Sequence, residues 1–205
     1  MNPLIVDPHN YDRKIAYEQA KKQCQEFLGS NKLREPGQWA TEMPMKKYQR
    51  NFGLYNHSRG GSVCVNLKKS RPPVKTPGFQ WSYTGYKSDL TAPGILAHEV
   101  GHHIDAVFLK ELSRDDRRST WATWDRIRRN EPRVSSYEPN DSEAFAESMK
   151  LFILNPDLLR TGRPLRYKFL TKALQLVPVH DLSWQQILVN AHPKLHAAAR
   201  KWMVR

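Results

Sequence analysis

The segment His98-Glu99-Val100-Gly101-His102 decides how the rest of the chain can be interpreted. Two histidines four positions apart on an α-helix lie on one face, offset by about 40°. Both imidazoles can therefore reach a single zinc ion. Glu99 is rotated about 100° from His98 on such a helix, so it is not an obvious third ligand. It is placed instead to contact a water on the metal, where a carboxylate can act as general base.

The residues around this segment predict that it is helical. Thr91 can cap a helix whose first turn tolerates Pro93, and residues 95–109 have the periodicity of an amphipathic helix. The alternative is a coincidental pair of solvated histidines on a surface helix. Apolar side chains are expected on the face opposite His98: Leu96, Val100, Ile104 and Val107.

A third metal ligand is expected from a second helix, over residues 142–154, which ends near Asn155-Pro156. Glu143 and Glu147 are four positions apart, so they face the same way. We expect Glu143 to bind the zinc and Glu147 to hydrogen-bond a ligand histidine. Three alternatives remain: with Asn140 as N-cap, Glu143 would close a capping box; Glu147 would be exposed helix surface; or Glu147 would be the metal ligand in place of Glu143. Apolar side chains lie roughly opposite: Phe145, Met149 and Phe152.

Other side chains near the two helices have candidate roles. Asp105 shares the histidine face, where it either orients an imidazole or forms an ordinary salt bridge. His103 lies on the flank of the apolar side, so we expect it to be packed or exposed rather than a ligand. Tyr137 precedes the second helix, and its phenol either stabilises an oxyanion or is a core or loop side chain. Trp121 and Trp124 are most simply core residues.

The pattern along the chain indicates an α+β fold, with one domain over residues 1–205. We expect an N-terminal helix and small sheet in 1–90, the active-site helices in 91–160 and further helices in 161–205. The expected elements are helices at 11–28, 120–129, 167–176 and 184–204, strands at 52–55, 62–67 and 79–83, and a proline-rich loop at 68–78.

Composition limits the class of protein and its partners. The net charge is +13, but residues 91–150 carry −2 and are the acidic part of the chain. The basic remainder favours an anionic partner, either nucleic acid or an acidic protein, or is solvated surface. No apolar run is long enough for a membrane span, and the first residues do not resemble a signal peptide, so we expect a cytoplasmic location. Cys24 and Cys64 are not in a close pair, which favours free thiols.

The motifs above resemble those of the gluzincin metallopeptidases, and most of all the group that contains anthrax lethal factor, the Pro-Pro endopeptidases and Mlc titration factor A. Residues 98–105 match the form HExGHxxD, and a tyrosine precedes Glu143-Ala144-Phe145-Ala146-Glu147, where Ala144 replaces a bulkier residue. The resemblance covers about residues 91–160. It implies a zincin-like domain in which His98, His102 and Glu143 bind Zn²⁺, Glu99 is the general base and Tyr137 stabilises the oxyanion.

The function that follows from the resemblance is zinc-dependent endopeptidase activity on a protein or peptide. In such enzymes the substrate pairs with an edge strand above the motif helix, a role we expect for a strand within residues 62–83. The alternative is a basic nucleic-acid-associated or virion-type binding protein with a structural or vestigial zinc site. The sequence is equally compatible with a bacterial protein, a phage-encoded protein and a delivered effector.

Overall fold

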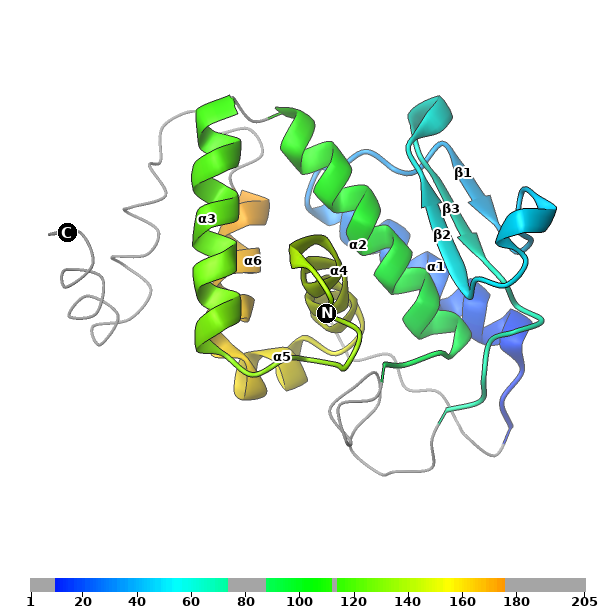
Figure 1. The fold of residues 1–205 in the computed structure, drawn as a ribbon. Coiled ribbons are helices and arrows are strands. Elements are labelled where there is room, and N and C mark those ends of the chain that lie inside the picture. Colours follow the sequence, from blue (N-terminus) through cyan, green and yellow to red (C-terminus); the bar gives the residue numbers. More distant parts are fainter. Residues whose placement is uncertain (1–9, 74–87, 112–113, 176–205) are drawn as a thin grey trace, which may run out of the picture.

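A computed structural model describes residues 10–73, 88–111 and 114–175 of the chain, and these form a mainly helical α+β arrangement with one small sheet (Figure 1). In chain order the elements are α1 (Arg13–Ser30), β1 (Gln38–Ala40), the 3₁₀ turn η1 (Lys46–Tyr48), β2 (Gly53–Asn56), the 3₁₀ turn η2 (Ser58–Gly60), β3 (Ser62–Val65), α2 (Ala92–Glu111), α3 (Arg114–Asn130), α4 (Asp141–Leu154), α5 (Pro156–Gly162) and α6 (Pro164–Gln175).

The sheet has three strands in the order β1-β3-β2. β1 runs parallel to β3, whereas β2 and β3 form an antiparallel hairpin. The hairpin connection contains Gly60 and Gly61 at φ of 81° and 89°, a backbone region that glycine enters without steric cost. The central strand β3 is the most apolar of the three, and Val63, Cys64 and Val65 are buried. The predicted pair of strands is therefore confirmed.

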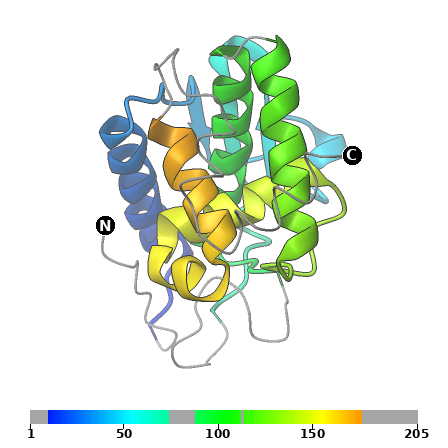
Figure 2. The same cartoon turned by 90° about the vertical axis from the view of Figure 1, so that its left-hand side faces the viewer.

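The helices form layers beside the sheet. α2 packs against β2 and β3 on one side and against α4 on the other, while α1 contacts both α2 and α4. Figure 1 shows the sheet at one end of the molecule and α3 with α6 at the opposite end, with α2 and α4 between them. Figure 2 views the molecule from the α3 and α6 end. The core runs through α2 and α4, which between them contact β2, β3 and each of the other four helices.

Polar side chains set the first turns of three helices. Asp12, Thr91 and Asn140 each accept a hydrogen bond from a backbone N–H in the first turn of α1, α2 and α4, respectively. The caps expected of Thr91 and Asn140 are thus confirmed. Both fall immediately before the helices that carry the candidate ligands, so they fix where those helices begin.

Three features differ from the expected pattern. α3 begins at Arg114, earlier than residue 120. β1 was not predicted, because three residues are too few to show alternation. α5 was not predicted either, because Pro156 was interpreted as a helix stop. Asn155 instead caps α5 by accepting the Leu158 N–H at 3.2 Å, and a proline fits the first position of a helix.

Two predicted elements and part of a predicted loop fall outside the residues that the structure describes. The strand expected at 79–83 and the helix expected at 184–204 lie outside the described residues. The loop expected at 68–78 is described as far as residue 73 and contains no helix or strand up to that point. In the described part of the chain, no helix combines the length and apolar character needed to cross a membrane.

α2 and α4 approach each other closely at Gly101. A Cβ placed on this glycine would lie 2.8 Å from Ala146 Cα and 3.0 Å from its carbonyl oxygen. Such distances are shorter than van der Waals contact, so only glycine fits in α2 at this crossing. The crossing lies one residue before His102 and three residues after Glu143, and it therefore sets the separation of the candidate ligands.

We predict that Gly101→Ala destabilises the protein by about 1–3 kcal/mol, because the added methyl group meets backbone that cannot rotate away. Urea unfolding followed by circular dichroism measures the change. Gly29→Ala is the matched control: Gly29 is also helical, a methyl group added there would have no neighbour within 4 Å, and the variant should be more stable by about 0.5–1 kcal/mol. Equal free energies of unfolding for wild type and Gly101→Ala would contradict the close-crossing interpretation.

Candidate metal centre

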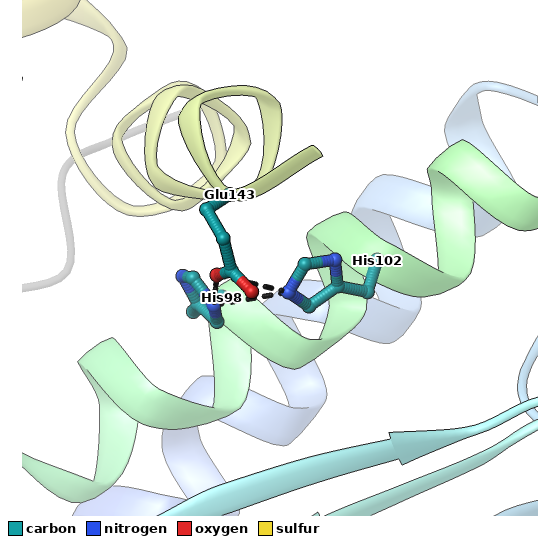
Figure 3. Close-up of side chains that lie close together, drawn as sticks. All are labelled: His98, His102 and Glu143. Atoms are coloured by element: carbon teal, nitrogen blue, oxygen red, sulfur yellow. Dashed lines mark hydrogen bonds and ion pairs between the residues drawn. The ribbon is translucent and has the colours of Figure 1, made fainter. Parts of the chain in front are cut away.

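Three side chains predicted as ligands converge between α2 and α4 (Figure 3). His98 and His102 project from α2, and Glu143 reaches toward them from the first turn of α4. His98 Nε2 lies 3.1 Å from His102 Nε2 and 3.1 Å from Glu143 Oε2, and His102 Nε2 lies 3.4 Å from the same oxygen. The structure therefore brings together one donor atom from each of the three residues.

The donor spacing fits a tetrahedral metal ion. Zinc ligands bonded at about 2.0–2.1 Å with tetrahedral angles stand about 3.3–3.4 Å apart, close to the three distances here. Glu143 Oε2 is buried and makes no hydrogen bond of normal geometry, although both Nε2 atoms are near. A buried carboxylate oxygen without a proper donor is a costly arrangement that a bound cation would relieve. The donor set thus fits a divalent metal.

The capping-box alternative for Glu143 explains the contact of its backbone but not the contacts of its carboxylate. The Glu143 backbone N–H does donate to the Asn140 side chain at 2.9 Å, as expected at an N-cap. The Glu143 carboxylate, however, contacts the two imidazoles. Backbone and side chain of this residue therefore have separate partners, and the cap helps to hold the carboxylate in place.

Each histidine is held from behind at Nδ1, which leaves Nε2 free for a metal. His98 Nδ1 donates to Glu147 Oε1 at 2.8 Å. His102 Nδ1 lies 3.4 Å from Ser142 Oγ, and this hydroxyl donates to Asp105 Oδ2 at 3.1 Å. Asp105 was expected either to orient an imidazole or to form a salt bridge. Asp105 acts on His102 indirectly, through the Ser142 hydroxyl that contacts both side chains and so helps to fix the orientation of the imidazole.

The charges of the centre shift its protonation equilibria in the metal-free protein. Burial lowers the pKa of His98, but Glu143 and Glu147 outweigh this effect and raise the pKa to about 9. Burial raises the pKa of Glu143, but His102 and His98 outweigh it and lower the pKa to about 2. Burial raises the pKa of Asp105 to about 6. A proton on His98 therefore occupies the centre when no metal does.

Glu99 is buried on the wall between α2 and β2. A Cβ on Gly53 would collide with Glu99 Oε1 and lie 2.7 Å from Ile95 Cγ2, so the glycine makes room for this carboxylate. Burial raises the pKa of Glu99, and the charges of His98 and His102 offset the effect only in part. Glu99 is not among the converging ligand atoms, as expected from its rotation around the helix.

Tyr137 stands at the mouth of the centre. Its side chain is 49% exposed, and its ring centroid lies 5.8 Å from that of His98. The loop that carries it is held by Glu138, which is fully buried, accepts the Val134 N–H at 2.6 Å and pairs with Arg166 at 3.0 Å. Tyr137 is therefore half exposed to solvent, while the backbone beside it is fixed.

These residues line one cleft of about 820 Å³. β2 forms one wall, and Phe52, Gly53 and Tyr55 face the space above the histidines. The expectation that the edge strand falls within residues 62–83 is wrong for β3, because β3 is central in the sheet. Among the strands that the structure describes, β2 is the edge strand beside the centre.

Several residues of the site were not singled out from the sequence. Ser142 and Gly53 act through contacts with another element, and neither has a spacing signal of its own. Lys150 looks like a solvated helix residue but is fully buried against Glu147. His103, by contrast, is packed as expected: its Nε2 donates to the Arg34 carbonyl at 2.7 Å.

We predict that metal binding releases about one proton per zinc ion near neutral pH. His98 carries a proton below a pKa of about 9 in the metal-free protein, and a histidine must lose this extra proton to bind zinc. The apparent affinity should therefore rise about tenfold per pH unit up to about pH 9 and level off above it. Titration calorimetry in buffers of different ionisation enthalpy counts the proton, and binding without proton release would contradict the assignment.

Comparisons with known proteins identified no relative of this chain: no family model, no curated protein and no solved structure matches it.

Proposed function

We propose that this protein is a zinc-dependent endopeptidase of the zincin type that hydrolyses peptide bonds in a protein or peptide substrate. One observation carries the proposal: His98 Nε2, His102 Nε2 and Glu143 Oε2 converge at tetrahedral spacing within a cleft that is also lined by a second carboxylate, Glu99. Two imidazoles and one carboxylate form the ligand set of many catalytic zinc sites, which keep a further position open.

Glu99 is the proposed general base. A zinc ion held by the three ligands would polarise the scissile carbonyl and acidify a water molecule. Glu99 takes one proton from this water as its oxygen attacks the carbonyl carbon, and then delivers the proton to the amide nitrogen as the C–N bond breaks. The raised pKa of Glu99 suits both halves of this role, because a base of very low pKa would retain no proton to donate.

Tyr137 is the proposed oxyanion donor. Its ring lies beside that of His98, and its side chain borders the cleft rather than the core. The phenol O–H can donate to the carbonyl oxygen as that oxygen gains negative charge. The buried Glu138–Arg166 pair supports this placement, because it fixes the backbone next to Tyr137.

β2 is the proposed binding edge for the substrate backbone. The Asn66 N–H donates to the Phe52 carbonyl at 2.8 Å, so alternate residues of β2 pair with β3. The backbone groups of Gly53 and Tyr55 therefore face away from β3, and within the described residues no strand pairs with them. An extended peptide added here would lie along the cleft above the histidines.

We predict that Glu99→Gln lowers peptide hydrolysis by about 10²–10⁴-fold while zinc content stays at that of the wild type, because the amide cannot accept the proton. Digestion of a diverse peptide library, read by mass spectrometry, measures the loss. Glu18→Gln, at an exposed position on α1, is the matched control and should cleave like the wild type.

Two outcomes of this experiment would contradict the proposal. Cleavage by Glu99→Gln at the wild-type rate excludes Glu99 as the base. Absence of cleavage by the zinc-bound wild type favours a basic binding protein instead. DNA binding that survives chelation and weakens steeply with salt would then support that alternative.

For Tyr137→Phe we predict a loss in kcat of about a hundredfold with little change in KM, because the hydroxyl acts only on the developing oxyanion. Steady-state kinetics on a peptide found in the library measures both constants. Tyr48→Phe, a tyrosine that does not line the cleft, serves as control. An unchanged kcat would mean that Tyr137 is a loop side chain without a role in catalysis.

A further inference from the structure

Among the lysines whose side chains the structure describes, Lys150 alone is fully buried. It lies on α4 one turn after Glu147, and its Nζ donates to both oxygens of the Glu147 carboxylate, at 2.8 and 2.7 Å. Burying an ammonium group is costly unless anions surround it. A lysine that only kept the protein soluble would lie at the surface. The burial of Lys150 therefore indicates a role inside the protein.

Glu147 connects Lys150 to the metal centre. The same oxygen, Oε1, accepts from Lys150 Nζ and from His98 Nδ1, each at 2.8 Å. A continuous line of contacts therefore runs from the ammonium group through one carboxylate to a ligand imidazole. The carboxylate is 1% exposed on its side-chain surface, so water does not compete for these contacts.

The charge of Lys150 also acts on a second carboxyl group, that of Asp89. Burial raises the pKa of Asp89, and the charge of Lys150 offsets this effect only in part. Asp89 Oδ1 in turn accepts the Thr91 N–H at 2.8 Å, immediately before α2 begins. Lys150 thus hydrogen-bonds the carboxylate that orients His98, and its charge also acts on the carboxyl group that holds the start of the helix on which His98 lies.

The geometry explains why a lysine is needed behind Glu147. A glutamate side chain has several rotatable bonds, and without the lysine its carboxylate would keep only the hydrogen bond from His98 and a long one, 3.5 Å, from the Ser88 hydroxyl. Contacts from Lys150 to both oxygens fix the carboxylate plane. Without the lysine, Glu147 would be a buried anion with one strong donor, an arrangement that proteins avoid by moving the group or admitting water.

We propose that Lys150 is a positioning residue of the metal centre: it holds Glu147 in the orientation that receives His98 Nδ1–H and so directs His98 Nε2 at the metal. The inference rests on the proposed function, because it takes zinc as the metal that the centre binds. Groups that orient a ligand histidine commonly change metal affinity by about 10- to 100-fold when they are removed.

The experiment is a double-mutant cycle in zinc affinity, measured by competition with a chromophoric chelator. The variants are Lys150→Met, Glu147→Gln and the two combined. We expect Lys150→Met to weaken zinc binding by about 10- to 100-fold. In the Glu147→Gln background the same substitution should change the affinity less than about threefold, because Lys150 acts through the Glu147 carboxylate.

Controls separate this role from a general effect on folding. Lys22→Met removes an exposed lysine from a pair with Glu26 on α1 and should leave zinc affinity unchanged. The combined variant removes both buried charges, an exchange that proteins commonly tolerate, so it keeps the cycle measurable. If Lys150→Met does not fold, Lys150→Gln takes its place, because its amide still fills the site and the expected direction is the same.

The inference is overturned if Lys150→Met binds zinc within about threefold of wild type, or if it weakens binding equally in the Glu147→Gln background. A wild type that binds zinc but cleaves no peptide contradicts the proposed function and leaves the role of Lys150 intact, because the readout is affinity. A wild type that does not bind zinc overturns both.

Discussion

The close crossing of α2 and α4 is the constraint on which the rest of the structure depends. Gly101 lets the two backbones approach until a methyl group would meet Ala146 Cα. At this distance a glutamate in the first turn of α4 spans the gap to a histidine pair on α2, whereas a wider crossing would leave the carboxylate short of both rings. The sheet, α1 and α6 then act as supports that keep the pair of helices from separating.

The polar groups of the centre are arranged in layers around the two imidazoles. Each ring has one nitrogen facing the shared space and the other held by a group behind it, Glu147 for His98 and Ser142 for His102. Behind His98, the positive charge of Lys150 balances the negative charge of Glu147. Such an arrangement fixes ring orientation before any cation arrives, so the reorganisation needed for binding is small.

The sequence was informative where function depends on spacing within a helix. The pair at 98 and 102, and the carboxylates at 143 and 147, follow from a 3.6-residue period alone, and the structure places them together. Ser142, Gly53 and the edge position of β2 depend on which element packs against which, and a single sequence does not contain that information. The exposed-surface alternative for Glu147 is wrong for the same reason: α4 is covered on nearly all sides, although Ser148 and Lys150 make it look half polar.

The two cysteines lie apart from all of this chemistry, and their burial has a consequence for oxidative stress. Cys24 and Cys64 are free and buried, and burial raises the pKa of both thiols. The thiolate is the form that reacts with peroxides and captures soft metals, so neither side chain offers much of it. A centre built from nitrogen and oxygen donors, in a chain whose two thiols are buried and have raised pKa values, should keep its ligands intact under oxidising conditions that disable thiolate-based sites.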